Sequence, residues 1–359
     1  MAIGRRDVML GALGLGITLV AGPRLLAAGE TEVPPRFSTY GLAPGGAIDH
    51  IAMLQAALDA TARSGTPLFL PPGVYSTSRL ELKSGTHFLG VPGKSILRYR
   101  GGGTILSIDH ARDIRIEGLA LDGGGHALGQ DGSLLGAMEV ERLEVSNCRF
   151  IGSSGDGLLL RRVSGRVTDC DIGDIRKAAI FSENARRLAI SRNSIHDCGD
   201  KGILVWGSEP GETIVAKNIV ERAATGITVT KFYRGGQRAV VRGNFVRNLF
   251  FRKCIQSSGN GISVEADAVV SGNVVENAPG FGILVGWIGH LRELTVTNNL
   301  IRNAHIGIGV SADRAASAPL ITGNLITGTK DGAIRVMNGP TPIGPDLARS
   351  SEAFRNLVS

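Results

Sequence analysis

Aromatic residues are scarce in this sequence, and several features that would assign it to a common class of protein are missing. Tryptophan, tyrosine and phenylalanine make up 5% of the 359 residues. The sequence has no basic helix and no aromatic-plus-basic cluster of the kinds usual in nucleic-acid-binding proteins, so we expect no nucleic-acid partner. Glycine contributes 51 residues, but it follows no Gly-X-Y period, which excludes a collagen triple helix.

Cysteine is also rare and does not form a metal-binding pattern. The four cysteines are Cys148, Cys170, Cys198 and Cys254, and none belongs to a Cys-x-x-Cys motif or a tight group with histidine. Cys198 and Cys254 fall in segments that we expect to be turns. Without such ligand groups the sequence predicts neither a metal site nor a cofactor.

Long hydrophobic runs are absent apart from one at the N-terminus. The apolar stretch from Val8 to Gly22 is interrupted by glycines and is too short for a comfortable membrane span. Arg5 and Arg6 precede it, and a small-residue segment ending at Ala28 follows. This order is typical of a signal peptide, and the paired arginines resemble the twin-arginine (Tat) export signal.

This segment leads to five expectations about the processing and localisation of the chain. Residues 1–28 are a Tat signal peptide, and residues 29–48 are a linker. The Tat export machinery is a partner, and the destination is the periplasm or the exterior. The mature protein has no stable membrane span. An uncleaved N-terminal anchor is the alternative.

The rest of the chain is dominated by a repeat of 22 to 29 residues. Each copy has asparagine followed by x-Ile/Val/Phe or a close variant, a turn, and then Gly-Ile-x-Val. The asparagine position is occupied in successive coils by Cys148, Cys170, Asn193, Asn218, Asn244, Asn273, Asn299 and Asn324. A regular repeat of this length is the signature of a solenoid, in which each coil buries its apolar face against its neighbours.

Stacking coils would place equivalent residues on top of one another. The asparagines are expected to form an inward ladder that satisfies backbone groups of the turns, which is a structural rather than a catalytic role. Cys148 and Cys170 would continue the ladder as stacked free thiols, and a disulfide between them is the alternative. A β-propeller is disfavoured because its blades need about 40–45 residues.

Both ends of the solenoid have distinctive patterns. Residues 49–63 predict an amphipathic helix that covers the first coil, with Asp49 at its start. The solenoid is expected over 49–345, where prolines break the pattern. Residues 346–359 form a tail in which Asp346–Arg355 predicts a short helix and Asn356–Val358 repeats the start of a coil. We expect an open or shortened last coil; a covering helix or a docked chain are the alternatives.

A family resemblance supports this architecture. The predicted cap helix, the segment Leu70-Pro-Pro-Gly-Val-Tyr75 and the segment Ile116-Glu-Gly-Leu-Ala-Leu-Asp-Gly123 resemble the pectate-lyase-like β-helix superfamily. Joined to the Tat signal and the repeats, they resemble the Tat-translocated repetitive proteins, which have no assigned activity. The resemblance implies an all-β fold: a right-handed parallel β-helix with a short N-terminal capping helix.

The repeat also predicts which residues face outward. In Gly-Ile-x-Val the Ile and Val point inward, so the x residue and the residue after Val point outward. Glu183 and Glu265 fall on this outward row three coils apart, about 14 Å, which exceeds the roughly 5–10 Å that a glycosidase requires. A lyase needs only a base and a neutralising charge. The charged residues of neighbouring coils are candidates for both roles: Arg176, Lys177, Glu183, Asp200 and Lys201. The alternative is that they are ordinary exposed charges of turns.

The few aromatic residues suggest where a glycan would bind. Trp206, Phe232, Tyr233 and Trp287 lie at or just beyond the ends of predicted strands, where exposed rings can stack on sugars; packing under a loop is the alternative. The sequence therefore predicts a carbohydrate-related role in the bacterial envelope, with acidic polysaccharide as the expected ligand. Two classes remain open: an enzyme of the polysaccharide-lyase type or another carbohydrate-active type, and a non-catalytic structural or glycan-binding scaffold.

Overall fold

The computed structural model describes residues 44–45, 49–129, 132–231, 233, 235–255, 257–312, 318–349 and 357–358. The predicted signal peptide with Arg5 and Arg6, nearly all of the predicted linker, and Phe232 lie outside the described residues. Among the described residues, no helix combines the length and the apolar character needed to cross a membrane.

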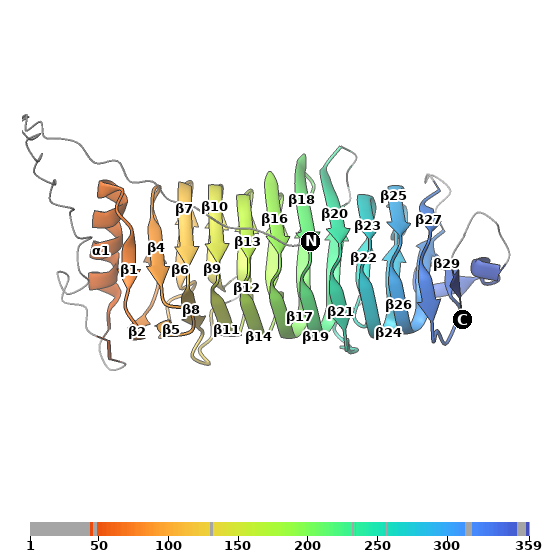
Figure 1. Ribbon diagram of the computed structural model, residues 1–359, viewed down its shortest axis with the longest axis horizontal. Helices are drawn as coiled ribbons and strands as arrows, with labels where there is room; N and C mark the ends of the chain where they lie inside the picture. The colour runs from red at the N-terminus through yellow and green to blue at the C-terminus, as the bar shows by residue number, and fades with distance from the viewer. Residues whose placement is uncertain are drawn as a thin grey trace, which may run out of the picture. The chain divides into compact units, whose positions relative to one another are not determined.

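The described chain is a parallel β-helix whose coils stack side by side (Figure 1). One face is an 11-stranded parallel sheet. Its strands are β1 (Leu68–Leu70), β4 (His87–Gly90), β7 (Arg112–Glu117), β10 (Glu141–Ser146), β13 (Ser164–Thr168), β16 (Arg187–Ser191), β18 (Gly211–Ala216), β20 (Gln237–Arg242), β23 (Ala266–Ser271), β25 (Arg292–Thr297) and β27 (Leu320–Thr322). This regular parallel pairing confirms the predicted fold class.

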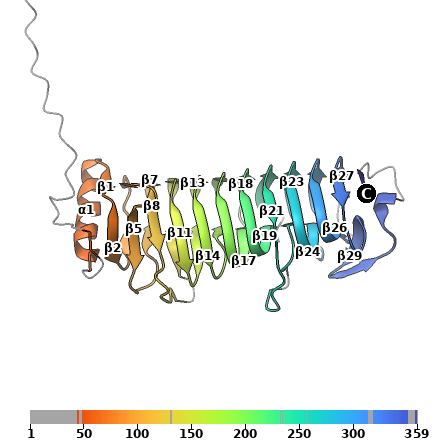
Figure 2. The ribbon, with the colours of Figure 1, turned by 60° about the horizontal axis from the view of Figure 1, so that its bottom comes forward.

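Two further faces complete each coil, and four long strands run through both of them (Figure 2). The long strands are β17 (Ser194–Trp206), β19 (Ile219–Thr230), β24 (Val274–Val285) and β26 (Leu300–Ser311). The first of these faces, called the β2 face, also contains β2 (Gly73–Thr77), β5 (Ser95–Tyr99), β8 (Leu119–Asp122), β11 (Arg149–Ser153), β14 (Asp171–Ile175), β21 (Phe245–Arg247), β28 (Leu325–Thr327) and β31 (Leu357–Val358).

The other face, called the β3 face, carries the outward row that the repeat predicts. It contains the second halves of the long strands together with β3 (Leu80–Glu81), β6 (Leu106–Asp109), β9 (Ser133–Met138), β12 (Asp156–Arg161), β15 (Ile180–Glu183), β22 (Ile262–Val264) and β29 (Ile334–Asn338). In register, Thr228 aligns with Ser263 and Ser263 with Leu284. Ile227 and Ile262 point inward and are fully buried, so the predicted outward row is confirmed.

The asparagines form a continuous buried ladder. Asn193, Asn218, Asn244, Asn273, Asn299 and Asn324 are each at most 2% exposed. Asn244 is typical: its Oδ1 accepts from Asn218 N at 3.0 Å, and its Nδ2 donates to Val215 O at 3.0 Å and to Asn273 Oδ1 at 2.9 Å. The inward orientation is the one the repeat predicts, and each amide satisfies buried polar groups of a neighbouring coil.

The ladder ends on cysteine. Asn193 Oδ1 accepts from the Cys170 backbone N–H at 3.0 Å, and Cys148 and Cys170 are buried free thiols. The contact with Cys148, together with burial, raises the pKa of the Cys170 thiol, which keeps it protonated. Cys198, which the sequence placed in a turn, instead lies buried inside β17. Its position continues the apolar stacking, since its register partners are Ile175 and Ala223.

The N-terminal cap is helix α1 (Ile51–Ser64). It begins two residues later than predicted, because His50 occupies the N-cap position and the Asp49 side chain caps from just outside by accepting from Ile51 N at 3.0 Å. The helix buries Leu54, Ala57, Leu58 and Thr61 against the first coil. It ends at Gly65, whose φ of 69° suits a residue without a Cβ.

The C-terminal region differs in part from the sequence expectation. Strand β30 (Thr341–Ile343) pairs antiparallel with β29, so β29 has a partner on each side and the expectation of an open edge is wrong for this strand. The predicted helix is represented in the described residues by a short 3-10 helix, η2 (Leu347–Arg349), with Asp346 Oδ1 accepting from Ala348 N. Strand β31 pairs parallel with β28, which is how a further coil would begin.

Candidate functional site

A cleft of about 760 Å³ lies on the outer side of the β3 face. We call it the Glu265 cleft. Its floor comes from the outward row of successive coils and includes Thr228, Thr230, Ser263, Glu265, Leu284 and Gly286. The walls come from the insertion between β21 and β22 (residues 248–261), from Trp287, and from Pro340 and Pro342 around β30. The β3 face is therefore hollowed here and is not a flat surface.

Glu265 is the carboxyl group in the floor of this cleft. It follows β22, and its N–H donates to Val229 O at 3.1 Å, which aligns it with Thr230 of the preceding coil. Burial raises the pKa of Glu265 to about 7, although the Lys231 N–H donates to Glu265 Oε2 at 2.7 Å and lowers it in part. A carboxyl group with a pKa near neutrality can donate or accept a proton at physiological pH.

The insertion of residues 248–261 is held against both neighbouring coils by backbone and side-chain hydrogen bonds. Gly259 N donates to Ala224 O at 2.6 Å, and Thr225 Oγ1 donates to Ser257 O at 2.8 Å. The Asn260 side chain accepts from Phe281 N at 3.1 Å. These contacts make the insertion a fixed wall, because they tie it to the coil before it and to the coil after it.

Aromatic rings lie in and beside the floor. The Phe281 ring lies directly over Gly309, since a Cβ at that glycine would be only 2.6 Å from Phe281 Cδ1. Trp287 and His290 pair across a tight turn that follows Gly286. Gly286 is aligned with Glu265 and lies in the next coil. Thr228 is 7% exposed, and its hydroxyl has no hydrogen-bond partner within the described part of the chain. The cleft thus combines apolar rings with a carboxyl group.

A second, smaller hollow adjoins the Glu265 cleft. It has a volume of about 380 Å³, and we call it the basic recess because it is lined by Arg176, Lys177 and Arg252. Asp200, Cys254 and Ile255 line both hollows, which makes them continuous. The Arg252 guanidinium is held in place by donating to Gly199 O and to Arg176 O.

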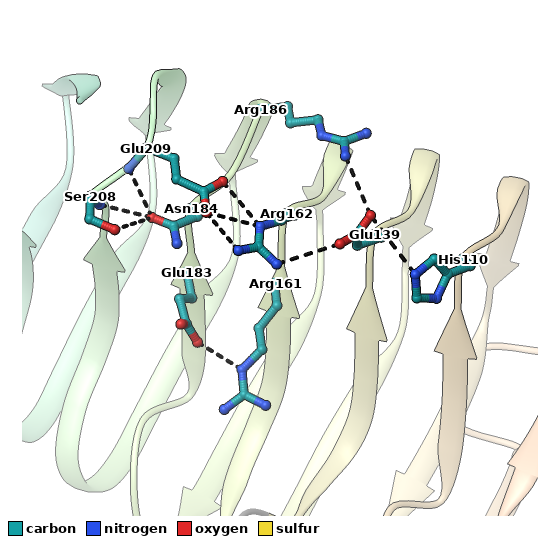
Figure 3. A network of polar contacts seen from close by, with 9 residues as sticks. All are labelled: His110, Glu139, Arg161, Arg162, Glu183, Asn184, Arg186, Ser208 and Glu209. Carbon is teal, nitrogen blue, oxygen red and sulfur yellow. Dashed lines mark hydrogen bonds and ion pairs between the residues drawn. The ribbon is translucent and has the colours of Figure 1, made fainter. Parts of the chain in front are cut away.

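The predicted catalytic candidates are distributed over these two hollows with one exception. Asp200 and Lys201 form an ion pair of 2.6 Å at the edge of the cleft, while Arg176 and Lys177 line the basic recess. Glu183 lines neither hollow. Figure 3 shows its carboxylate turned to the Arg161 side chain, which donates to Glu183 Oε2 at 2.7 Å.

A separate charge network lies beside Glu183 along the neighbouring turns (Figure 3). Arg162 makes a bidentate contact with Glu209 and also reaches Glu139 at 3.4 Å, and Arg186 contacts the same Glu139 at 3.6 Å. The Asn184 side chain accepts from the backbone of Ser208 and of Glu209. These contacts link the turns of successive coils, so this network stabilises the stacking of one coil on the next.

The aromatic residues predicted to bind a glycan do not lie together in one site. Trp287 lines the Glu265 cleft, whereas Trp206 is partly buried beside Glu183, with which it aligns in register. Tyr233 is 60% exposed, and its carbonyl accepts from Arg292 at 2.6 Å.

The repeat placed Glu265 on the outward row but did not single it out as a catalytic residue. The signal that could have done so is the insertion directly before β22, because an insertion in a regular solenoid builds a wall.

Among the described residues, no group of three or more His, Cys, Asp and Glu side chains is close enough to hold a metal ion.

The comparisons with known proteins agree with the fold. Residues 136–292 match the family model for a right handed beta helix region. The chain is therefore a right-handed parallel β-helix protein. No curated protein sequence is similar enough to be recognised as a relative.

Solved structures with the same fold include several proteins that act on or recognise carbohydrates or surfaces. A hyperthermoactive exopolygalacturonase from Thermotoga maritima is 13% identical, with a TM-score of 0.66 over 86% of this chain and 92% of its own. The A-module of a mannuronan C-5 epimerase from Azotobacter vinelandii is 16% identical, with a TM-score of 0.58 over 90% and 94%. The Streptococcus pneumoniae surface adhesin PfbA is 14% identical, with a TM-score of 0.56 over 86% and 94%. At these identities the likeness concerns the fold alone.

Proposed function

We propose that this protein binds and processes an acidic polysaccharide of the bacterial envelope in the Glu265 cleft, after export by the Tat route. The observation that carries the proposal is a half-buried glutamate with a pKa of about 7 at the bottom of an aromatic-lined cleft. Perturbed carboxyl groups in concave sites are typical of acid–base catalysis. The polysaccharide-active and adhesive proteins among the structural neighbours support a carbohydrate ligand.

The spacing of the carboxyl groups favours proton transfer by a single residue over hydrolysis. Lys201 aligns with Thr225, and Glu265 aligns with Thr230 two coils from Lys201. Asp200 is therefore separated from Glu265 by about 10 Å across the coils and by roughly 16 Å along the strands. A hydrolase needs two carboxyl groups within about 10 Å, whereas a lyase requires one base that removes a proton next to a sugar carboxylate.

The basic recess gives this reaction its preference for an anionic chain. Arg176, Lys177 and Arg252 line a hollow that continues from the cleft. Charge-assisted hydrogen bonds from guanidinium groups suit carboxylates. Sugar units bound there would extend the chain away from the unit that lies against Glu265 and Trp287.

The alternative function is a non-catalytic glycan-binding scaffold, and one observation favours it. Within the described chain the charged groups of the basic recess are separated from Glu265 by several coils, so none neutralises a sugar carboxylate directly at Glu265. A surface adhesin shares the fold. In this case the cleft would hold a glycan without changing it.

A glycan array, combined with assays for reducing ends and for unsaturated products, separates the two functions. Wild-type protein is compared with Glu265→Gln and with Glu276→Gln, a matched control whose carboxylate pairs with Arg302 at 3.2 Å away from the cleft. An enzyme loses turnover in Glu265→Gln and retains it in Glu276→Gln. Binding without any product, unchanged by Glu265→Gln, identifies the scaffold, and the absence of any bound glycan contradicts the proposal.

A further inference from the structure

A third hollow, of about 710 Å³, lies on the side of the 231–236 segment that faces the 11-stranded sheet. Five basic side chains line it: Arg186, Arg187, Lys231, Arg238 and Arg292. Three carboxylates oppose them: Glu212, Asp267 and Glu293. We call this hollow the arginine recess, and its basic residues outnumber its acidic ones.

A buried ion cluster forms the base of the recess. Lys231 is 2% exposed, and its ammonium group pairs with Asp267 Oδ2. Arg292 Nη2 reaches the same oxygen at 2.7 Å and also donates to Tyr233 O at 2.6 Å. One carboxylate therefore serves two cations, so the base of the recess retains positive charge at low exposure to water, where it is weakly screened.

The mouth of the recess is arranged along the stacked coils. Arg187 aligns with Glu212, and Glu212 aligns with Arg238, so cationic groups recur on alternate coils. Arg238 contacts Glu212 at 2.6 Å. Arg187 is exposed and forms no ion pair with the described residues, while Arg186 is turned toward Glu139 (Figure 3).

The spacing of these groups indicates the shape of a ligand. Arg187 and Arg238 are two coils apart, about 10 Å, and Arg292 lies a further two coils along the stack. Gly235 and Gly236 line the recess without side chains, which leaves their part of its surface uncovered. An extended chain with repeated anionic groups can contact several arginines at once, and a single small ion cannot.

We propose that the arginine recess is a second binding site that takes an extended anionic oligosaccharide through carboxylate or sulfate groups. Guanidinium groups bind both kinds of oxyanion through paired hydrogen bonds. The site lies apart from the Glu265 cleft, and Lys231 links the two, since its N–H donates to Glu265 while its ammonium group pairs with Asp267. Binding here does not require any reaction in the cleft.

Isothermal titration calorimetry tests the site with three tetrasaccharides: a galacturonate tetramer, a sulfated tetramer and a neutral glucose tetramer. We expect at least one anionic tetramer to bind, with affinity that falls as salt is added, and the neutral tetramer not to bind. Arg187→Ala and Arg238→Ala should each weaken binding about ten-fold, as expected for the loss of one charge-assisted hydrogen bond. Both side chains are exposed, so these variants should fold normally.

Two controls keep this site distinct from the cleft. Arg166→Ala removes an exposed arginine of the 11-stranded sheet, which pairs with Glu144 at 2.8 Å, and should leave binding unchanged. In Trp287→Ala, which weakens the cleft, a salt-dependent anion-binding event should remain and should still be weakened by adding Arg238→Ala. Equal binding of the neutral tetramer, insensitivity to both Arg187→Ala and Arg238→Ala, or loss of anion binding in Trp287→Ala would overturn the proposal. None of these results would affect the function proposed for Glu265.

Discussion

At the scale of single residues, position in the coil decides what a side chain does. Glu183 and Glu265 occupy the same outward row. Glu183 forms an ion pair with Arg161, whereas burial raises the pKa of Glu265. Asn244 and the other ladder asparagines are polar residues placed where most solenoid positions are apolar, and each is fully hydrogen bonded. Buried polar groups are stable only when they are satisfied in this way.

The asparagine ladder should be sensitive to truncation at its centre. Asn244→Ala removes the acceptor of Asn218 N and the donor to Val215 O, which leaves two buried groups of the preceding coil without these partners. We expect a loss of about 1–3 kcal/mol in the free energy of unfolding, measured by urea denaturation. Thr297→Ala is the control: Thr297 alternates with buried Val296 at the end of β25, on the outer side of the 11-stranded sheet, and its loss should change stability little. Equal stability of Asn244→Ala and wild type would contradict a structural ladder.

Glu265 should make stability depend on pH. Its pKa in the folded protein, about 7, lies above its ordinary value of 4.5, so the folded protein holds this proton more tightly than the unfolded chain does. The stability linked to this group is fully present below pH 4.5 and is lost as the pH rises to about 7. Melting temperatures at both ends of this range, compared between wild type and Glu265→Gln, should show the extra loss in wild type alone. An identical pH dependence in both proteins would mean that this pKa is not raised.

At the scale of elements, one insertion and one hairpin convert a regular face into a cleft. Residues 248–261 form one wall, and β30 places Pro340 and Pro342 opposite to it. The long strands β17 and β19 pair beneath this region with a register shift between Cys198 and Lys201. The irregular parts of the solenoid thus determine where a ligand can bind.

Two tryptophans test this assignment because only one of them lines the cleft. Trp287→Ala removes an aromatic surface beside Glu265 and should weaken glycan binding by roughly 1–3 kcal/mol, the range typical of stacking on an aromatic ring. Trp206→Ala is the matched control and should bind normally, because Trp206 lies beside Glu183 outside the cleft. Titration of both variants with the glycan identified by array is the measurement. If Trp206→Ala is the weaker binder, the site lies further toward the N-terminus.

The sequence predicts the regular parts of the molecule well and the irregular parts poorly, for a physical reason. Gly-Ile-x-Val specifies register, because a shift by one residue would turn Ile262 and its equivalents out of the core. The same logic placed the ladder asparagines inside. It could not show that residues 248–261 fold back over Ala224 and Thr225, since no repeat pattern describes an insertion. The pKa of Glu265 depends on that fold and was therefore not predictable.

At the scale of the whole molecule, the chain is a stack of coils with a capped N-terminal end. Helix α1 covers the first coil, and β30 pairs with β29 at the other end of the β3 face. Unpaired strand edges promote aggregation, so such covers favour a soluble stack. The proposed Tat route fits this fold, because Tat substrates cross the membrane already folded.

Export should depend on the paired arginines of the N-terminal segment. Changing Arg5→Lys together with Arg6→Lys should retain the precursor in the cytoplasm, because twin-arginine recognition requires both guanidinium groups. Cell fractionation followed by immunoblotting measures the distribution, and Arg24→Lys is the control. Normal periplasmic delivery of the double variant would show that another route carries the protein.

The most direct test of the central claim, that the Glu265 cleft holds a glycan, is a hydrogen-exchange footprint. It compares the full mature protein with and without a saturating amount of the tightest-binding oligosaccharide from the array. We predict new protection in three segments that border the cleft: residues 248–261, Trp287–His290 and Thr341–Ile343. Protection that avoids all three segments and falls on the regular part of the β3 face near Glu183 would contradict the account.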